Sequence, residues 1–251
     1  MLLRGAQPPS TPPAKPGDTT RLDKAAVTRV ATDARAKLAV ELPEGVDLSL
    51  WASDELLVDP VAIDLDPDGT LYVTSSMRNN MPLDIRQHQD WMATVHTLRS
   101  MQDLRAFYRK LMAPANSAKN TWITDLNKDG SRDIKDMEEY KERIYRIRDT
   151  DGDGRADESR LVYQGFNDDP AFDILGGILL QGGSVIAGGP PGVYRLRDTD
   201  GDGVLDQRTT IGEGFNTHPG FGGHASQAPG GGPGDPHQES RELKACHHPG
   251  P

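Results

Sequence analysis

The chain contains one segment twice, and this repeat restricts its fold more than any other feature. The segment Arg-Asp-Thr-Asp-Gly-Asp-Gly begins at Arg148 and again at Arg197, and each copy runs on to a Gly-Phe-Asn. Asp198 follows Asp149 by 49 residues, and the two copies align without a gap. A period of this length is typical of one blade of a β-propeller. The repeat therefore predicts a propeller-type β fold, with an acidic, calcium-type loop in each blade.

Composition narrows the class of protein. At 251 residues the chain is long enough for one large β domain or two small ones, and its net charge of -10 argues against binding to nucleic acid. No stretch approaches the roughly 20 apolar residues of a membrane span, and no signal peptide is readable at the start. The single Cys246 excludes an internal disulfide.

The two ends differ in composition from the middle of the chain. Residues 1–20 are rich in Pro, Thr and Gly and are expected to form a disordered leader. Apolar residues at helical spacing predict a helix over 21–39. Residues 225–251 show no periodicity and are expected to be a disordered tail. One hypothesis is that this tail comes from an out-of-frame or spliced-on sequence.

The region between them, residues 40–224, reads as short strands. Alternating apolar residues predict a strand over 46–52, and a hairpin follows over 60–74 around an Asp-Pro-Asp-Gly turn, where the aspartates are interpreted as turn residues. Further short strands are expected after Lys141, at 143–147, 160–163, 177–180, 184–187, 192–196 and 209–211. The predicted fold is mainly β: a partial β-propeller of about two blades or slightly more.

Residues 85–112 interrupt this β pattern. Their apolar residues recur every three or four positions, from Met92 to Leu111, which predicts one face of a helix that ends before Pro114. We interpret the segment as a helical insertion between propeller strands, with its apolar face in a core.

An acidic loop over 125–136 matches a calcium-binding pattern at every position. Such a loop needs oxygen donors at positions 1, 3, 5, 7, 9 and 12, and glycine at position 6. The donors here are Asp125, Asn127, Asp129, Ser131, Asp133 and Asp136. The loop resembles an EF-hand or dockerin loop, and the alternative is a solvated Asp turn.

The two repeated loops match the same pattern less completely. Their candidate ligands occupy positions 1, 3, 5 and 9, and are Asp149, Asp151, Asp153 and Asp157 in one copy and Asp198, Asp200, Asp202 and Asp206 in the other. Position 12 holds Arg160 or Thr209, so the closing carboxylate is missing. Clustered carboxylates repel one another without a cation, which favours calcium, and plain Asx turns between strands are the alternative.

Candidates for catalysis are few. His218 and His224 lie in a Gly-rich segment after the second repeat, where imidazoles could act as a base or as metal ligands at a propeller mouth. Loop histidines without a role are the alternative. The segment around Cys246 lacks the spacing of a haem-attachment motif.

Several of these motifs together resemble a bacterial family of membrane-bound dehydrogenases. The similar segments are Pro43-Glu-Gly-Val-Asp-Leu-Ser-Leu-Trp51, Asp68-Gly-Thr-Leu-Tyr-Val73 and the two repeated Asp loops, within residues 40–224. The family has a six-bladed propeller like the soluble glucose and sorbosone quinoprotein dehydrogenases. The resemblance implies sugar or alcohol oxidation, with pyrroloquinoline quinone or haem as cofactor, a cytochrome c acceptor, and a periplasmic or extracellular location.

The chain also departs from that family. It carries no haem motif, and the resemblance stops at about His224, whereas a six-bladed ring needs on the order of 300 residues. One hypothesis is therefore a fragment of an exported propeller dehydrogenase, inactive alone. The second is a calcium-stabilised binding or adhesion module, and the third is a product that does not fold stably.

Overall fold

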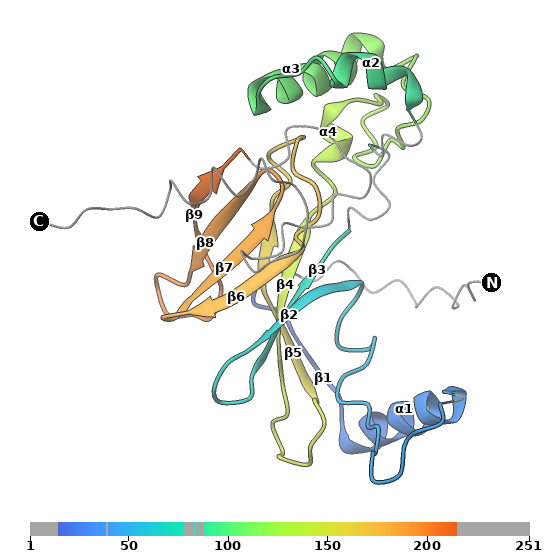
Figure 1. The fold of residues 1–251 in the computed structure, drawn as a ribbon, viewed down its shortest axis with the longest axis vertical. Helices are drawn as coiled ribbons and strands as arrows, with labels where there is room; N and C mark the ends of the chain where they lie inside the picture. The colour runs from blue at the N-terminus through green and yellow to red at the C-terminus, as the bar shows by residue number, and fades with distance from the viewer. Residues whose placement is uncertain (1–14, 39, 78–82, 84–87, 215–251) are drawn as a thin grey trace, which may run out of the picture.

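The protein is mainly β, and its strands form two antiparallel sheets (Figure 1). The structure is a computed structural model, and it describes residues 15–38, 40–77, 83 and 88–214. The first sheet has the order β1-β5-β4-β3-β2 and comprises β1 (Thr19–Arg21), β2 (Pro60–Leu65), β3 (Leu71–Ser75), β4 (Glu142–Arg148) and β5 (Glu158–Gly165). The second has the order β6-β7-β8-β9 and comprises β6 (Gly177–Gln181), β7 (Ser184–Gly189), β8 (Gly192–Arg197) and β9 (Gln207–Glu213). The partial propeller predicted from the repeat is confirmed as two successive sheets.

The predicted hairpin is present as β2 and β3. The N–H of Asp66 donates to the carbonyl of Thr70 at 2.9 Å, and the N–H of Gly69 donates back to the carbonyl of Asp66 at 2.9 Å. The side chain of Asp68 accepts from the N–H of Thr70 at 2.8 Å. These bonds close the turn, so its aspartates are turn residues, as interpreted from the sequence.

Every strand predicted after Lys141 is present. The two copies of the repeat also share a β-bulge at equivalent positions. The register of β4 and β5 shifts between Ile144 and Tyr145, which leaves Val162 as a bulge. The register of β8 and β9 shifts between Val193 and Tyr194, which leaves Ile211 as a bulge 49 residues later. The two sheets therefore share this bulge as well as the repeated sequence segment.

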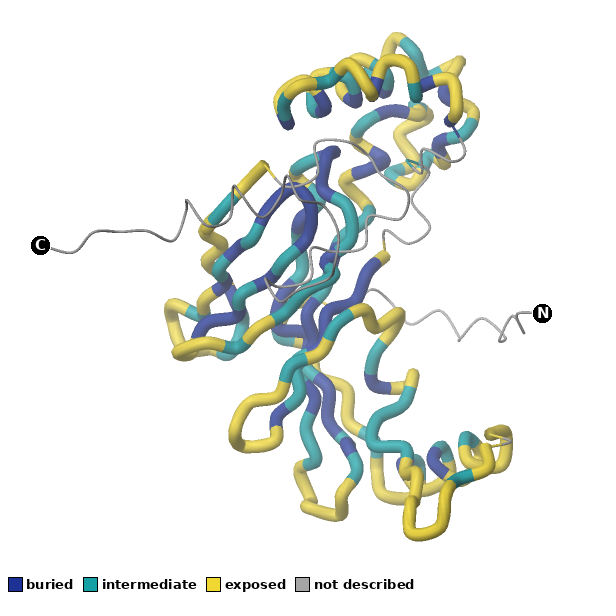
Figure 2. The backbone as a smooth tube through the Cα atoms, viewed as in Figure 1, coloured by how far each residue is buried: buried dark blue, intermediate teal, exposed yellow. Residues whose placement is uncertain are grey.

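One face of each sheet packs against the other sheet, and we call these the inner faces. Ile144 and Val162 of the first sheet lie in one cluster with Ala187 and Leu196 of the second, and all four are at most 2% exposed. Figure 2 shows that buried segments run through the strands of both sheets. The amide of Leu180 in β6 also donates to the carboxylate of Asp64 in β2 at 2.7 Å. Apolar burial and this bond hold the sheets together.

The N-terminal segments differ in part from the prediction. Helix α1 (Lys24–Lys37) is present within the expected range and is capped by Asp23, whose carboxylate accepts from the N–H of Ala26 at 2.8 Å. The expected disordered leader is wrong at its end, because Thr19 and Thr20 pair with β5 in strand β1. The strand expected over 46–52 is also absent, because these described residues pair with no strand in either sheet.

The helical insertion connects β3 to β4 but is not one helix. The described part contains a 3-10 turn (η3, Gln89–Trp91), α2 (Met92–Val95), α3 (Met101–Leu111), a second 3-10 turn (η4, Pro114–Asn116) and α4 (Ile134–Met137). Ser100 breaks the expected helix, because its hydroxyl accepts from the N–H of Asp103 at 3.2 Å and starts α3 anew. The predicted apolar face is buried, with Leu104 and Met112 in a separate core. The insertion lies at the end of the first sheet opposite the β4–β5 loop (Figure 1).

Candidate metal-binding loops

Three acidic loops share one hydrogen-bond framework, although they follow different elements. We call residues 125–136 the insertion loop, 149–157 the first repeat loop and 198–206 the second repeat loop. In each loop the carboxylate at position 1 accepts from the glycine N–H at position 6. The pairs are Asp125 with Gly130 at 3.1 Å, Asp149 with Gly154 at 2.8 Å, and Asp198 with Gly203 at 2.8 Å.

The remaining side chains of the framework also repeat. In each loop the side-chain oxygen at position 3 accepts from the N–H at position 5, and that at position 5 accepts from the N–H at position 7. The first kind is found at Asn127, Asp151 and Asp200, and the second at Asp129, Asp153 and Asp202, with distances of 2.7–3.2 Å. These bonds wrap the backbone around the position-1 carboxylate in all three loops.

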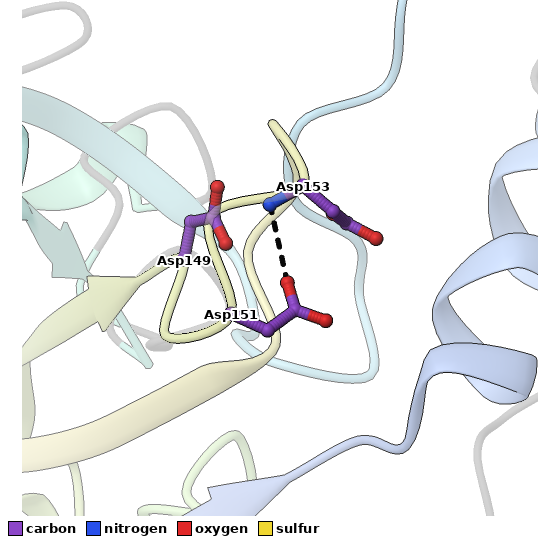
Figure 3. A group of neighbouring side chains, drawn as sticks. All are labelled: Asp149, Asp151 and Asp153. Carbon is purple, nitrogen blue, oxygen red and sulfur yellow. Dashed lines mark hydrogen bonds between the residues drawn. The ribbon is translucent and has the colours of Figure 1, made fainter.

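The two repeat loops bring three carboxylates together each. Ligand-type oxygens of Asp149, Asp151 and Asp153 all lie within 4.8 Å of one another (Figure 3). The same holds for Asp198, Asp200 and Asp202 in the second loop. One member of each group is half-buried and two are exposed, so each cluster is open to solvent on one side.

Two predicted ligands of the repeat loops have a different contact. Asp157 accepts from Thr150 through both oxygens, from its N–H at 2.8 Å and from its hydroxyl at 2.6 Å. Asp206 binds Thr199 in the same way, at 2.9 and 2.5 Å. These carboxylates close the loop at position 2, and the structure does not group them with the other three. The sequence signal for this role is the threonine that both copies carry at position 2.

Hydrogen bonds keep the position-1 carboxylates of the two repeat loops ionised. Desolvation raises the pKa of Asp149, but the N–H donors of Gly154 and Gly152 outweigh it, so that the pKa lies below its ordinary value. The N–H of Gly203 lowers the pKa of Asp198, with a further contribution from Gly201. Both groups are therefore anions at neutral pH, which is the form that binds a hard cation.

The insertion loop arranges its acidic residues differently. Asp133 and Asp136 form a capping box at the start of α4. Asp136 is fully buried, and its Oδ1 accepts from the N–H of Leu126 at 2.8 Å. Among the described residues these two carboxylates are not grouped with Asp125. The Oδ1 atom of Asp125, however, is buried without a hydrogen-bond partner, and such an atom is suited to a bound cation.

Protein cations also contact the repeat loops. Nζ of Lys24 lies 3.2 Å from the Oδ2 atom of Asp153, and the guanidinium of Arg160 donates to the carbonyl of Asp202 at 2.7 Å. Arg160 stands at position 12 of the first repeat loop, where a calcium loop would carry its last ligand. It contacts the other repeat loop instead, so it neutralises charge between the sheets.

Each repeat loop also fastens its sheet to the segment that comes before it. The residue at position 8 is buried in both loops, Ala156 at 2% exposure and Leu205 at 9%. The N–H of Ala156 donates to the carbonyl of Trp51 at 2.7 Å, and the N–H of Leu205 donates to that of Val162 at 2.8 Å. Sequence reasoning missed this role, although an apolar residue between aspartates was its signal.

The histidines predicted as catalytic candidates, His218 and His224, lie outside the described residues, and their role stays a prediction. Within the described part of the chain, no helix has the length and apolar character needed to cross a bilayer.

Comparison with known proteins places the chain in a family. No curated protein and no solved structure matches it. Residues 32–224 match the family described as "Domain of unknown function (DUF7133)". This range contains the second sheet, every strand of the first sheet except β1, the insertion and all three acidic loops, and the chain therefore belongs to the DUF7133 family.

Proposed function

We propose that this protein is a calcium-stabilised, propeller-type module whose acidic loops hold its sheets in place. The observation that carries the proposal is the framework of hydrogen bonds that three loops share, because in the two repeat loops it brings three carboxylates to a common centre. Oxygen-only donor sets of this kind suit calcium, whereas magnesium is less suited to crowded carboxylates.

The residues that would hold calcium follow from the contacts. In the repeat loops these are the triplets Asp149, Asp151, Asp153 and Asp198, Asp200, Asp202. In the insertion loop the buried Oδ1 of Asp125 would be the central ligand, with Asn127 and Asp129 beside it. A cation in any of these loops would offset the repulsion between its carboxylates.

The position of the loops explains why such binding would matter to the fold. Both repeat loops connect an acidic cluster directly to a buried position-8 residue and to the carbonyl of the preceding segment. A cation in the second repeat loop would therefore order the contact between the sheets, and one in the first repeat loop would order the contact with residues 46–52. In this proposal calcium acts as a structural ion, and the module presents surfaces for binding or adhesion.

Equilibrium dialysis of the full chain against calcium, with the metal-free chain prepared by chelation, tests this directly. We expect a stoichiometry of two to three ions per chain. Binding of no ion at millimolar calcium would refute the proposal, because extracellular calcium loops bind in or below this range.

A role in sugar or alcohol oxidation is the second candidate. The observation that favours it is the mainly β fold of two successive sheets, because the dehydrogenases that the sequence resembles have a propeller fold. A dye-linked assay with sugars and alcohols, pyrroloquinoline quinone and calcium tests it. Quinone-dependent dye reduction that His224→Ala abolishes would support this candidate. No reduction under any of these conditions would remove it for the chain on its own.

A further inference from the structure

The repeat allows equivalent residues on the faces of the two sheets to be compared directly. Val162, the bulge residue of the first sheet, is 2% exposed because the second sheet covers it. Ile211, the bulge residue at the equivalent position of the second sheet, is 52% exposed. The second sheet therefore carries the same contact residue on its outer face, where the described part of the chain provides no cover.

The rest of that outer face carries apolar side chains and one arginine. Leu179, Ile186 and Arg195 lie opposite one another on β6, β7 and β8 and point to one side. Leu179 is 48% exposed. Arg195 is the repeat equivalent of Arg146, which lines the cleft between the sheets together with Asp198. An occupant of this face should therefore offer apolar side chains and an acidic loop.

The outer face of the first sheet is complementary to it. Ile63, Val73, Tyr145 and Leu161 form one row across β2, β3, β4 and β5. The last three are buried under a cluster that includes Leu56 and Trp51. Ile63 at the end of the row is 63% exposed, and Leu65 beside it is 59% exposed. The acidic first repeat loop connects two strands of this same sheet.

Residues 46–52 lie in the layer that a neighbouring sheet would occupy. The carbonyl of Trp51 accepts from Ala156, as the carbonyl of Val162 in β5 accepts from Leu205 at the equivalent contact. The segment alternates apolar and polar residues like a strand, and Val46 and Leu48 are 55% and 43% exposed. It resembles a strand that belongs to no sheet of the described chain.

Strand β9 is an edge that could take up this segment. Its equivalent β5 is covered by the residues around β1: the N–H of Leu161 donates to the carbonyl of Asp18 at 3.1 Å, and its carbonyl accepts from Gly17 at 2.8 Å. Thr210 is the repeat equivalent of Leu161, so its backbone groups point away from β8. In the second sheet β9 is the last strand, and an edge of this kind is a template for pairing.

We propose that these open surfaces fit one another between two copies of the chain. The outer face of the second sheet in one copy packs on the outer face of the first sheet in the next, and β9 pairs with residues 46–52 of that copy. Leu179 then faces Ile63 and Leu65, Ile211 lies beside residues 46–52, and Arg195 faces the first repeat loop. The two surfaces differ, so the contact is heterologous and generates a ring or an open chain of copies.

Two single variants and their mixture test this contact. Ile211→Asp damages only the second-sheet surface and Ile63→Asp only the first-sheet surface, while Val40→Asp, at a residue outside both sheets that is 45% exposed, is the control. Sedimentation velocity should show concentration-dependent species larger than a dimer for the wild type and the control. Each of the two variants alone should sediment as the 27.3 kDa monomer.

The mixture separates this contact from other modes of association. An equimolar mixture of Ile211→Asp and Ile63→Asp retains one intact pair of surfaces, so it should form a heterodimer of twice the chain mass and nothing larger. A monomeric wild type at all concentrations, a variant that still associates alone, or a monomeric mixture would each overturn the proposal. Circular dichroism checks that the variants are folded; if either is not, Ile211→Ser and Ile63→Ser replace them with the same expected outcomes.

Discussion

At the scale of single residues, the carboxylate at position 1 of each acidic loop has a double task. Asp149 accepts from Gly152 and Gly154 at 2.8 Å and at the same time belongs to the three-carboxylate cluster. Its hydrogen bonds shape the loop whether or not a cation is bound. Its remaining charge is what a cation would use.

Replacing Asp149 with Asn should separate these two tasks. The amide oxygen can still accept hydrogen bonds, but the cluster loses one negative charge, so Asp149→Asn should lower the stabilisation that calcium gives. Asp68→Asn is the matched control, because Asp68 also accepts from a backbone N–H in an Asp-Gly turn but belongs to no cluster. Calorimetry with and without calcium measures the effect, and an equal calcium response of Asp149→Asn and wild type would contradict the assigned ligand set.

Glu158 should make stability depend on acidic pH. Burial raises its pKa, but hydrogen bonds from Arg148 and Arg21 outweigh this and hold the pKa below its ordinary value of 4.5. The folded-state pKa is depressed, so this contribution is fully present above about pH 4.5 and is lost as the pH falls through the folded-state pKa. Arg148→Gln should cost about 1–3 kcal/mol near neutral pH, since a buried charge loses hydrogen bonds.

Urea unfolding at several pH values measures the contribution of Glu158 to the free energy of unfolding. The wild type should lose stability more steeply than Glu158→Gln below pH 4.5. Parallel acid limbs for the two proteins would show that Glu158 does not contribute.

At the scale of elements, the second repeat loop connects the two sheets and is also a candidate metal site. Leu205 packs into the core between the inner faces, and its N–H holds the carbonyl of Val162. Leu205→Ala should therefore destabilise the protein by about 2–3 kcal/mol through the cavity that it leaves. Val40→Ala, at an exposed residue, should change stability by less than about 0.5 kcal/mol. Urea unfolding that gives equal losses for both would argue against Leu205 as the fastening residue.

The elements also show what sequence patterns could and could not predict. The strands after Lys141 were predictable because Gly, Pro and Asp turns bound each of them and the repeat fixed their spacing. Residues 46–52 have the alternation of a strand, yet pairing requires a neighbour, and alternation cannot say whether one is there. The insertion was expected as one helix because its apolar periodicity continues past Ser100, whereas the cap of α3 depends on a local hydrogen bond that periodicity does not record.

The acidic loops illustrate the same limit at the candidate site. The insertion loop matches the calcium-binding sequence pattern best, because it has a carboxylate at position 12. In the structure Asp133 and Asp136 of that loop cap α4, while the repeat loops, which lack position 12, bring three carboxylates together. Hydrogen-bond donors compete for the carboxylates and so decide which oxygens face a common centre. Thr150 and Thr199, for example, bind Asp157 and Asp206, and the spacing of ligand positions in the sequence does not record such contacts.

At the scale of the whole molecule, the two sheets form a small unit with much of its cohesion at one interface. The net charge of -10 works against this compact state, and part of it lies in the second repeat loop, whose Asp198 lines the cleft between the sheets. Calcium in these loops should therefore stabilise the entire two-sheet unit rather than a local turn.

The most direct test is thermal unfolding of the full chain with increasing calcium, starting from metal-free protein. If calcium binds the folded loops, a concentration of 100 times the dissociation constant should stabilise the protein by about 2.7 kcal/mol for each site. We therefore expect the melting temperature to rise steadily with calcium, with a much smaller response to magnesium. A melting temperature that does not change up to millimolar calcium would contradict the assignment of these loops as calcium sites.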